Sequence, residues 1–150
     1  MMKKRRRARE LALQTLYSEE LTGTDLQTLL AQLKERAPQE VYEFASHLVK
    51  KVMDNNSFLN EHIAQSVKNW EYERIAVIDR IILKIALCEL LFFEEIPPRV
   101  SINEAIDLAK IFSTAKSGKF VNGIIDNLYK KFEAQGKIQK KGQGLLNKNK

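Results

Sequence analysis

Apolar residues recur along most of this 150-residue chain at spacings of three and four, which is the period of an amphipathic α-helix. No stretch shows the apolar-polar alternation of a half-buried strand, and no motif repeats at a fixed period. The predicted helices cover residues 5–21, 24–36, 38–52, 58–67, 72–93, 101–112 and 117–132. The sequence therefore predicts an all-α fold of about seven helices.

Local signals refine the ends of the last helices. Ser101 followed by Glu104 has the spacing of a capping box, and Ser117 precedes the apolar stripe of the last helix. Both serines are therefore predicted to be N-caps. Beyond them the composition turns to Lys, Gln, Gly and Asn, which predicts a folded domain over residues 1–136 and a flexible basic tail over 137–150.

The longest apolar stretch lies in the predicted helix over residues 72–93. It contains four charged residues, Asp79, Arg80, Lys84 and Glu89. These charges argue against a membrane span and for a long helix buried at the centre of the domain. A double proline ends the pattern soon afterwards.

The net charge of +6 is unevenly distributed. Residues 1–9 carry six Lys or Arg and no acid, and residues 130–150 carry seven Lys and one Glu. Residues 10–129 carry 12 bases and 18 acids, so the body of the chain is acidic. Basic ends indicate a polyanion such as nucleic acid, or they serve solubility alone, and an acidic body suits a basic protein partner.

The sequence offers no convergent set of catalytic or metal-binding residues. Cys88 is the only cysteine, which excludes an internal disulfide and a cysteine zinc site and predicts a cytoplasmic protein. His47 and His62 lie on different predicted helices without a carboxylate-histidine cluster. The stretch SGKFVNG, residues 117–123, lacks the glycine that a P-loop needs five residues before its Gly-Lys pair. We therefore predict a binding module without metal or cofactor, and not an enzyme.

Four segments resemble the NusB family of transcription antitermination factors. They are RRRARELALQTLY (5–17), IDRIILKIALCEL (78–90), INEAIDLAK (102–110) and KFVNGIIDNL (119–128). They stand in the family's order and spacing and cover nearly a third of the chain. Residues 22–70 match the family only in their helical character.

The resemblance implies an all-helical fold of two packed helical subdomains and no catalysis. It implies binding of single-stranded boxA RNA from ribosomal RNA leaders, together with NusE, a small ribosomal protein. The pair joins other Nus factors in the RNA polymerase antitermination complex. The resemblance leaves open whether the free protein is a monomer or a homodimer.

The resemblance also implies two RNA-contacting segments, the basic start of the chain and the region around KFVNG. The predicted RNA-binding residues are Lys3, Lys4, Arg5, Arg6, Arg7, Arg9, Lys116, Lys119, Phe120 and Asn122. The cations would meet phosphates, Phe120 would stack on an unpaired base, and Asn122 would read a base edge. From the residues alone, Phe120 could equally belong to the core, whereas Val121 is expected to be buried.

Glu73 and Asp79 are the predicted contacts to NusE, because acidic positions at this point face NusE in related proteins. On one continuous helix the two residues would lie about 120° apart and edge one broad face. The sequence leaves open the alternative that Asp79 pairs with a neighbouring base and contributes only to folding.

Three other functions compete with RNA binding. NusB-like domains also precede RNA methyltransferases, but about fourteen residues follow Gly136, too few for a methyltransferase domain. A helical DNA-binding protein with an arginine-rich arm is the second rival, and a protein-interaction scaffold with solubilising ends is the third. Competition between boxA RNA and duplex DNA separates RNA binding from DNA binding.

Overall fold

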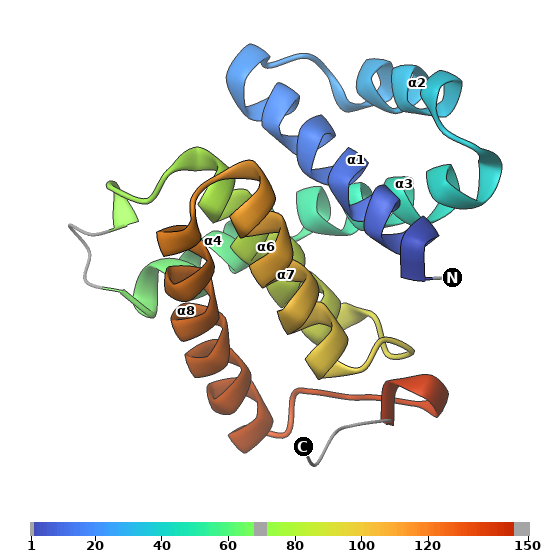
Figure 1. Ribbon diagram of the computed structural model, residues 1–150. Coiled ribbons are helices and arrows are strands. Elements are labelled where there is room, and N and C mark those ends of the chain that lie inside the picture. The colour runs from blue at the N-terminus through green and yellow to red at the C-terminus, as the bar shows by residue number, and fades with distance from the viewer. Residues whose placement is uncertain (1, 68–71, 146–150) are drawn as a thin grey trace. The chain divides into compact units, whose positions relative to one another are not determined.

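The computed structural model describes residues 2–67 and 72–145, which form two compact units. The regular secondary structure in these ranges consists of helices alone (Figure 1), so the predicted all-α fold is confirmed. The first unit, Met1–Asp54, holds three of the described α-helices. The second, Asn55–Lys150, holds four more and a short 3-10 helix, η1, at Gly142–Leu145.

The first unit packs α1 (Met2–Thr22) against α3 (Gln39–Asp54), and α2 (Leu26–Arg36) contacts both. Its core is aliphatic and includes Leu11, Leu13, Leu16, Leu30, Leu33, Val41, Leu48, Val49 and Val52. The chain leaves α1 through Gly23, whose φ of 68° is left-handed and favours glycine. Its N–H donates to the Glu19 carbonyl at 2.9 Å, which satisfies a carbonyl at the end of α1.

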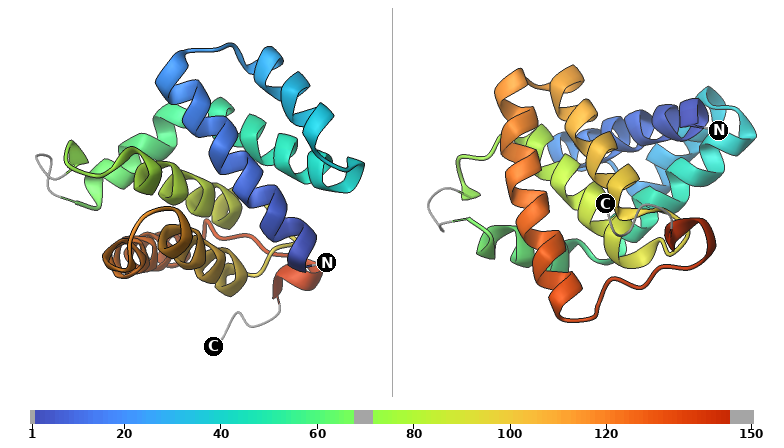
Figure 2. Two further views of the ribbon diagram at one scale, coloured as in Figure 1. Left: turned by 45° about the horizontal axis from the view of Figure 1, so that its top comes forward. Right: turned by 60° about the horizontal axis from the view of Figure 1, so that its bottom comes forward.

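The second unit is built on α6 (Val77–Phe92), which contacts α4 (Asn56–Gln65), α7 (Pro98–Phe112) and α8 (Ala115–Ala134). Eleven of the sixteen residues of α6 are buried, so the prediction of a buried central helix is confirmed. Helices α7 and α8 follow one another through a short turn and lie side by side (Figures 1 and 2).

Helix α6 begins five residues later than predicted. Residues 73–75 form a turn, and Ala76 is extended with ψ 144°. Glu73 therefore precedes the helix that carries Asp79. The expectation that the two residues lie at the edges of one face of a single helix was wrong. Apolar periodicity continues through the turn because Ile75 is buried as well, so the pattern alone could not mark the start.

Helices α7 and α8 begin before their predicted caps. Pro98 is the first residue of α7, where its fixed φ suits a helix and its missing N–H is not needed. Ser101 therefore lies inside α7, and its buried hydroxyl donates to Glu89 Oε1 of α6 at 2.8 Å. The N-cap of α8 is Thr114, whose hydroxyl oxygen accepts from the Ser117 N–H at 3.1 Å. The capping-box interpretation and the Ser117 cap were therefore wrong.

The chain after α8 packs on the second unit, where the sequence predicted a flexible tail. Gly136, with φ 71°, ends α8 and turns the chain. Residues 137–145 then run back to the turn between α6 and α7, as both views in Figure 2 show. There the Lys141 N–H donates to the Glu94 carbonyl at 3.0 Å, and Ile138 is buried.

Lys140 fastens this segment to the end of α6. Its side chain is 8% exposed, and its amino group donates to the carbonyls of Glu89 at 3.1 Å and Phe93 at 2.8 Å. The same carbonyls also accept from the backbone N–H groups of Phe93 and Ile96 at 3.2 Å, so Lys140 is a second donor to each, and a cation there meets the negative end of the helix dipole. Residues 137–145 are thus packed on the second unit and do not form the predicted flexible tail. Residues 146–150 lie outside the described residues.

Replacing Lys140 with Met keeps the apolar stem and removes the donor. We expect the free energy of unfolding to fall by about 1–3 kcal/mol, because two carbonyls lose a partner. Urea denaturation measures this change. Lys130→Met is the matched control, since Lys130 is exposed and forms a surface pair with Asp126; we expect a change within about 0.5 kcal/mol. Equal losses in both variants would show that Lys140 does not hold the segment.

The same lysine gives this prediction a pH dependence. Burial lowers the pKa of Lys140 from 10.5 to about 8, against the opposing attraction of Glu89 and two further glutamates. Between about pH 8 and 10.5 the unfolded chain therefore binds more protons than the folded chain, so this group's contribution to stability rises with pH. The neutral amine still has N–H donors for both carbonyls. The stability difference between the wild-type chain and Lys140→Met should accordingly grow from pH 8 to pH 10.

Candidate nucleic-acid interface

The basic start of the chain forms the first turns of α1. Lys3, Lys4 and Arg7 are exposed. Lys4 Nζ lies 2.7 Å from Glu40, and the Arg7 guanidinium lies 3.1 Å from Glu10. Exposed ion pairs of this kind contribute little, so phosphates can replace their carboxylates. The first turn of α1 holds no acidic residue, and the helix N-terminus adds positive potential to these cations.

Arg5 and Arg9 occupy a different place from the exposed cations. Their guanidinium groups lie 4.5 and 5.4 Å from the centre of the Phe44 ring on α3. Arg5 and Arg6 are half-buried, whereas Arg9 is only 3% exposed. This cation-π packing gives Arg9 a structural role inside the first unit. The RNA contacts predicted for the arm remain predictions, and this geometry favours Lys3, Lys4 and Arg7 over Arg9.

The start of α8 displays the second predicted segment on the surface of the second unit. Lys116, Lys119 and Asn122 are exposed. Phe120 is 38% exposed, whereas Val121 is completely buried. The expected burial of Val121 is confirmed, and the Phe120 ring lies at the surface, where an unpaired base can stack on it.

Ser117 joins the start of α8 to the start of α6. Its hydroxyl lies 2.8 Å from Ser113 Oγ and 3.1 Å from Thr114 Oγ1, and it donates to Asp79 Oδ2 at 2.9 Å. The hydroxyl groups before KFVNG are therefore engaged with one another and with a carboxylate. This cluster positions α8 and is not arranged as a phosphate cradle.

Glu73 and Asp79, the predicted protein-partner residues, have contrasting surroundings. Glu73 is exposed in the turn before α6. Asp79 is 6% exposed in the first turn of α6, and its partner is the Ser117 hydroxyl, where the sequence-based alternative supposed a base. The internal position favours a folding role for Asp79, and Glu73 is the carboxylate that a partner can reach. Contact with a partner stays a prediction for both.

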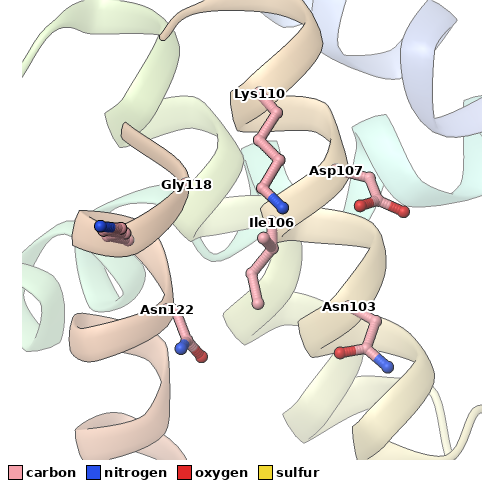
Figure 3. Close-up of a pocket in the computed structure, with 7 residues that line it drawn as sticks. Asn103, Ile106, Asp107, Lys110, Gly118 and Asn122 are labelled. Atoms are coloured by element: carbon pink, nitrogen blue, oxygen red, sulfur yellow. The ribbon is translucent and has the colours of Figure 1, made fainter. Parts of the chain in front are cut away.

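A groove of about 510 Å³ lies between α7 and α8, beside this segment (Figure 3). From α8 it is lined by Gly118, Lys119 and Asn122. From α7 it is lined by Asn103, Ile106, Asp107 and Lys110. The polar α7 residues were not among the predicted site residues. Their spacing of four and three within INEAIDLAK marks one helical face, which is the signal that could have found them.

The remaining reactive side chains have packing roles in the part of the chain that the structure describes. No group of three His, Cys, Asp or Glu residues there could hold a metal ion, and Cys88 is buried. His62 packs between Phe58 and Phe132, with ring centres 4.5 and 4.9 Å away. Burial, followed by the charge of Lys131, lowers the pKa of His62. Among the same residues no helix is long and apolar enough to span a membrane.

The described residues form two helical units, with exposed cations at the start of α1 and at the start of α8. Comparison with known proteins identifies the family of the chain. The sequence model of the NusB family matches residues 6–130. Transcription antitermination protein NusB of Salinibacter ruber is 43% identical over 149 residues, covering 97% of this chain and 92% of that protein. The same-named protein of Bacillus mycoides is 41% identical over 125 residues, covering 83% of this chain and 96% of that protein. The chain belongs to the NusB family.

Solved structures agree with this assignment. NusB of T. maritima is 36% identical and superposes with a TM-score of 0.77, covering 84% of this chain and 90% of that one. A crystal structure of the antitermination factors NusB and NusE in complex with double-stranded RNA contains a chain that is 28% identical, with a TM-score of 0.78. That match covers 87% of this chain and 99% of the other. The fold of this chain is therefore that of the NusB structures.

Proposed function

We propose that this chain is a transcription antitermination factor that binds boxA-type single-stranded RNA of ribosomal RNA leaders together with NusE. The pair joins the RNA polymerase antitermination complex with other Nus factors in the cytoplasm. The chain acts by binding and catalyses no reaction. The observation that carries the proposal is the outward display of Lys116, Lys119, Phe120 and Asn122 at the start of α8 in a chain of the NusB family.

This surface suits unpaired RNA. Lys116 and Lys119 bring positive charge to a helix start, where the helix dipole already favours phosphate. Phe120 offers a ring for stacking, and Asn122 offers both a donor and an acceptor. Single-stranded RNA exposes base faces and edges that an A-form duplex hides, so an exposed aromatic ring and an exposed carboxamide favour the single strand. The exposed cations of α1 add contacts to the RNA backbone.

The acidic body of the chain supports a basic protein partner. NusE is a ribosomal protein, and an acidic surface speeds and orients the docking of a basic one. Glu73 is the accessible carboxylate of the two predicted contacts. The NusB relative crystallised with NusE and double-stranded RNA supports NusE and RNA as partners.

Reversing the charge of Glu73 tests the partner and the RNA together. We expect NusE to strengthen boxA RNA binding by the wild-type chain about tenfold, a typical coupling between two ligands. Glu73→Lys should abolish this enhancement and leave RNA binding by the chain alone unchanged or slightly stronger. Fluorescence anisotropy of labelled boxA RNA, with and without NusE, measures both quantities. Glu61→Lys, which reverses another exposed acid of the second unit, should keep the enhancement.

Competitor nucleic acids separate the rival functions. Scrambled single-stranded RNA, duplex RNA and duplex DNA should each displace labelled boxA RNA less well than unlabelled boxA RNA. Equal displacement by duplex DNA would make the chain a DNA-binding protein. If no RNA binds even at low salt, the basic ends serve solubility, and the proposed function is wrong. If NusE enhancement survives Glu73→Lys, the partner docks on another face.

A further inference from the structure

We propose that the groove between α7 and α8 is a base-reading subsite for one unpaired nucleotide whose base carries an amino group. The inference rests on the proposed RNA binding and names what the RNA surface reads. Asn103, Asp107 and Asn122 hydrogen-bond the edge of the base. Lys110 and Lys119 meet the phosphates on either side of it.

Position 118 has no side chain, and the Lys110 side chain of α7 occupies the space beside it. A Cβ on Gly118 would lie 3.0 Å from Cγ of Lys110 and 3.7 Å from Cγ2 of Ile106. The bare backbone of α8 therefore lets the Lys110 side chain lie between the two helices. The volume of about 510 Å³ is within the range of sites that hold small molecules.

The polar groups stand on both walls of this groove. Figure 3 shows the carboxamides of Asn122 on α8 and Asn103 on α7 on opposite sides of the groove, with the apolar side chain of Ile106 between them. Asp107 lies one turn further along α7 from Asn103. A flat base placed on Ile106 therefore has polar partners at more than one of its edges. A surface that bound only the phosphates of the RNA backbone would not need these partners.

The chemistry of these partners selects among the bases. Each carboxamide both donates and accepts, so it can pair with any base. The carboxylate of Asp107 only accepts, and its two oxygens can accept several hydrogen bonds, so it can take one from a base beside its contacts within the protein. Adenine, cytosine and guanine carry an amino donor on the edge that single-stranded RNA exposes, whereas uracil offers only its N3–H, flanked by two carbonyl oxygens that repel a carboxylate. The groove should therefore disfavour uracil at one position of the RNA.

The groove also continues the surface already assigned to RNA. Lys119 and Asn122 belong both to the displayed start of α8 and to the lining of the groove. Phe120, the exposed ring, is the immediate neighbour of Lys119. At about 100° per residue, Lys119 lies between Phe120 and the groove-lining face around α8, so a strand that leaves the Phe120 ring can pass over Lys119 into the groove.

Removing one amino group at a time from the bases of the RNA tests this assignment. In a boxA RNA, each amino-bearing base is replaced in turn by an analogue that lacks the amino group, such as inosine for guanosine or purine riboside for adenosine. We expect one replacement to weaken binding to the wild-type chain roughly tenfold, the effect of losing a hydrogen bond to a charged group. Asp107→Asn should weaken binding of the unmodified RNA to a similar extent and should be insensitive to that one replacement.

A matched carboxylate provides the control. Asp126 lies on α8 outside the groove and pairs with Lys130 at 3.0 Å. Asp126→Asn should bind the unmodified RNA like the wild-type chain and keep its sensitivity to the replacement. Thermal unfolding of all three proteins shows that they are equally folded.

Two results would overturn the subsite. In the first, the wild-type chain tolerates every replacement within about twofold. In the second, Asp107→Asn remains as sensitive as the wild-type chain. Failure of the proposed function looks different, because the wild-type chain would then bind boxA RNA no better than scrambled RNA, and the subsite would fall with it.

Discussion

Replacing Lys3, Lys4 and Arg7 together with Gln is expected to halve the salt dependence of RNA binding. If the chain neutralises about six phosphates, log affinity should fall with log salt with a slope of about −4, and removing three contacts should leave about −2. Between 50 and 200 mM salt the wild-type chain should then lose about 300-fold in affinity and the variant about 20-fold. These three side chains are the exposed cations of the arm, so their removal should leave the helical circular dichroism intact.

The control removes the same charge from elsewhere in the first unit. Lys34, Arg36 and Lys50 are exposed and lie outside the arm, so replacing them with Gln should leave the slope near −4. Equal flattening by the two triple variants would mean that net charge, and not the arm, sets the affinity. An unchanged slope in the arm variant would place the arm away from the RNA.

Replacing Phe120 with Ala is expected to weaken RNA binding by about 1–3 kcal/mol, or roughly 5- to 150-fold. The side chain is 38% exposed, so its removal leaves no internal cavity, and the free energy of unfolding should change by less than about 1 kcal/mol. Chemical denaturation and RNA titration of the same preparation give both numbers.

Phe132 is the matched ring for this test. It lies on the same helix but is completely buried, beside His62. Phe132→Ala should lower the free energy of unfolding by about 3–5 kcal/mol and leave the RNA affinity of the folded protein nearly unchanged. The stacking role of Phe120 would be wrong if Phe120→Ala behaved like Phe132→Ala, with lost stability and intact RNA binding.

The sequence alone determined the helical class, the central position of α6 and the burial of Val121. These features follow from local periodicity, because an apolar residue every three or four positions can be buried only if the segment is helical. The family resemblance added the segment around KFVNG, and the structure displays Lys119, Phe120 and Asn122 at the surface. Whether these residues contact RNA stays a prediction.

Side-chain roles depended on partners far away in the chain, and these only the tertiary structure decided. Ser101 has the spacing of a cap, yet its hydroxyl on α7 donates a hydrogen bond to the Glu89 carboxylate on α6. Arg9 belongs to a basic run, yet it packs on Phe44. Lys140 stands in a segment whose composition predicts solvation, yet the carbonyls at the end of α6 hold it. Composition and spacing describe a residue's neighbours along the chain, whereas burial and hydrogen bonding depend on what the fold brings beside it.

The groove between α7 and α8 shows the same division. The sequence contains Asn103, Asp107 and Lys110 on one helical face, and it contains Gly118 and Asn122 one helical turn apart. Neither pattern shows that the two faces meet. The packing of α7 against α8 brings them together, and the missing side chain at position 118 makes room for the Lys110 side chain between them.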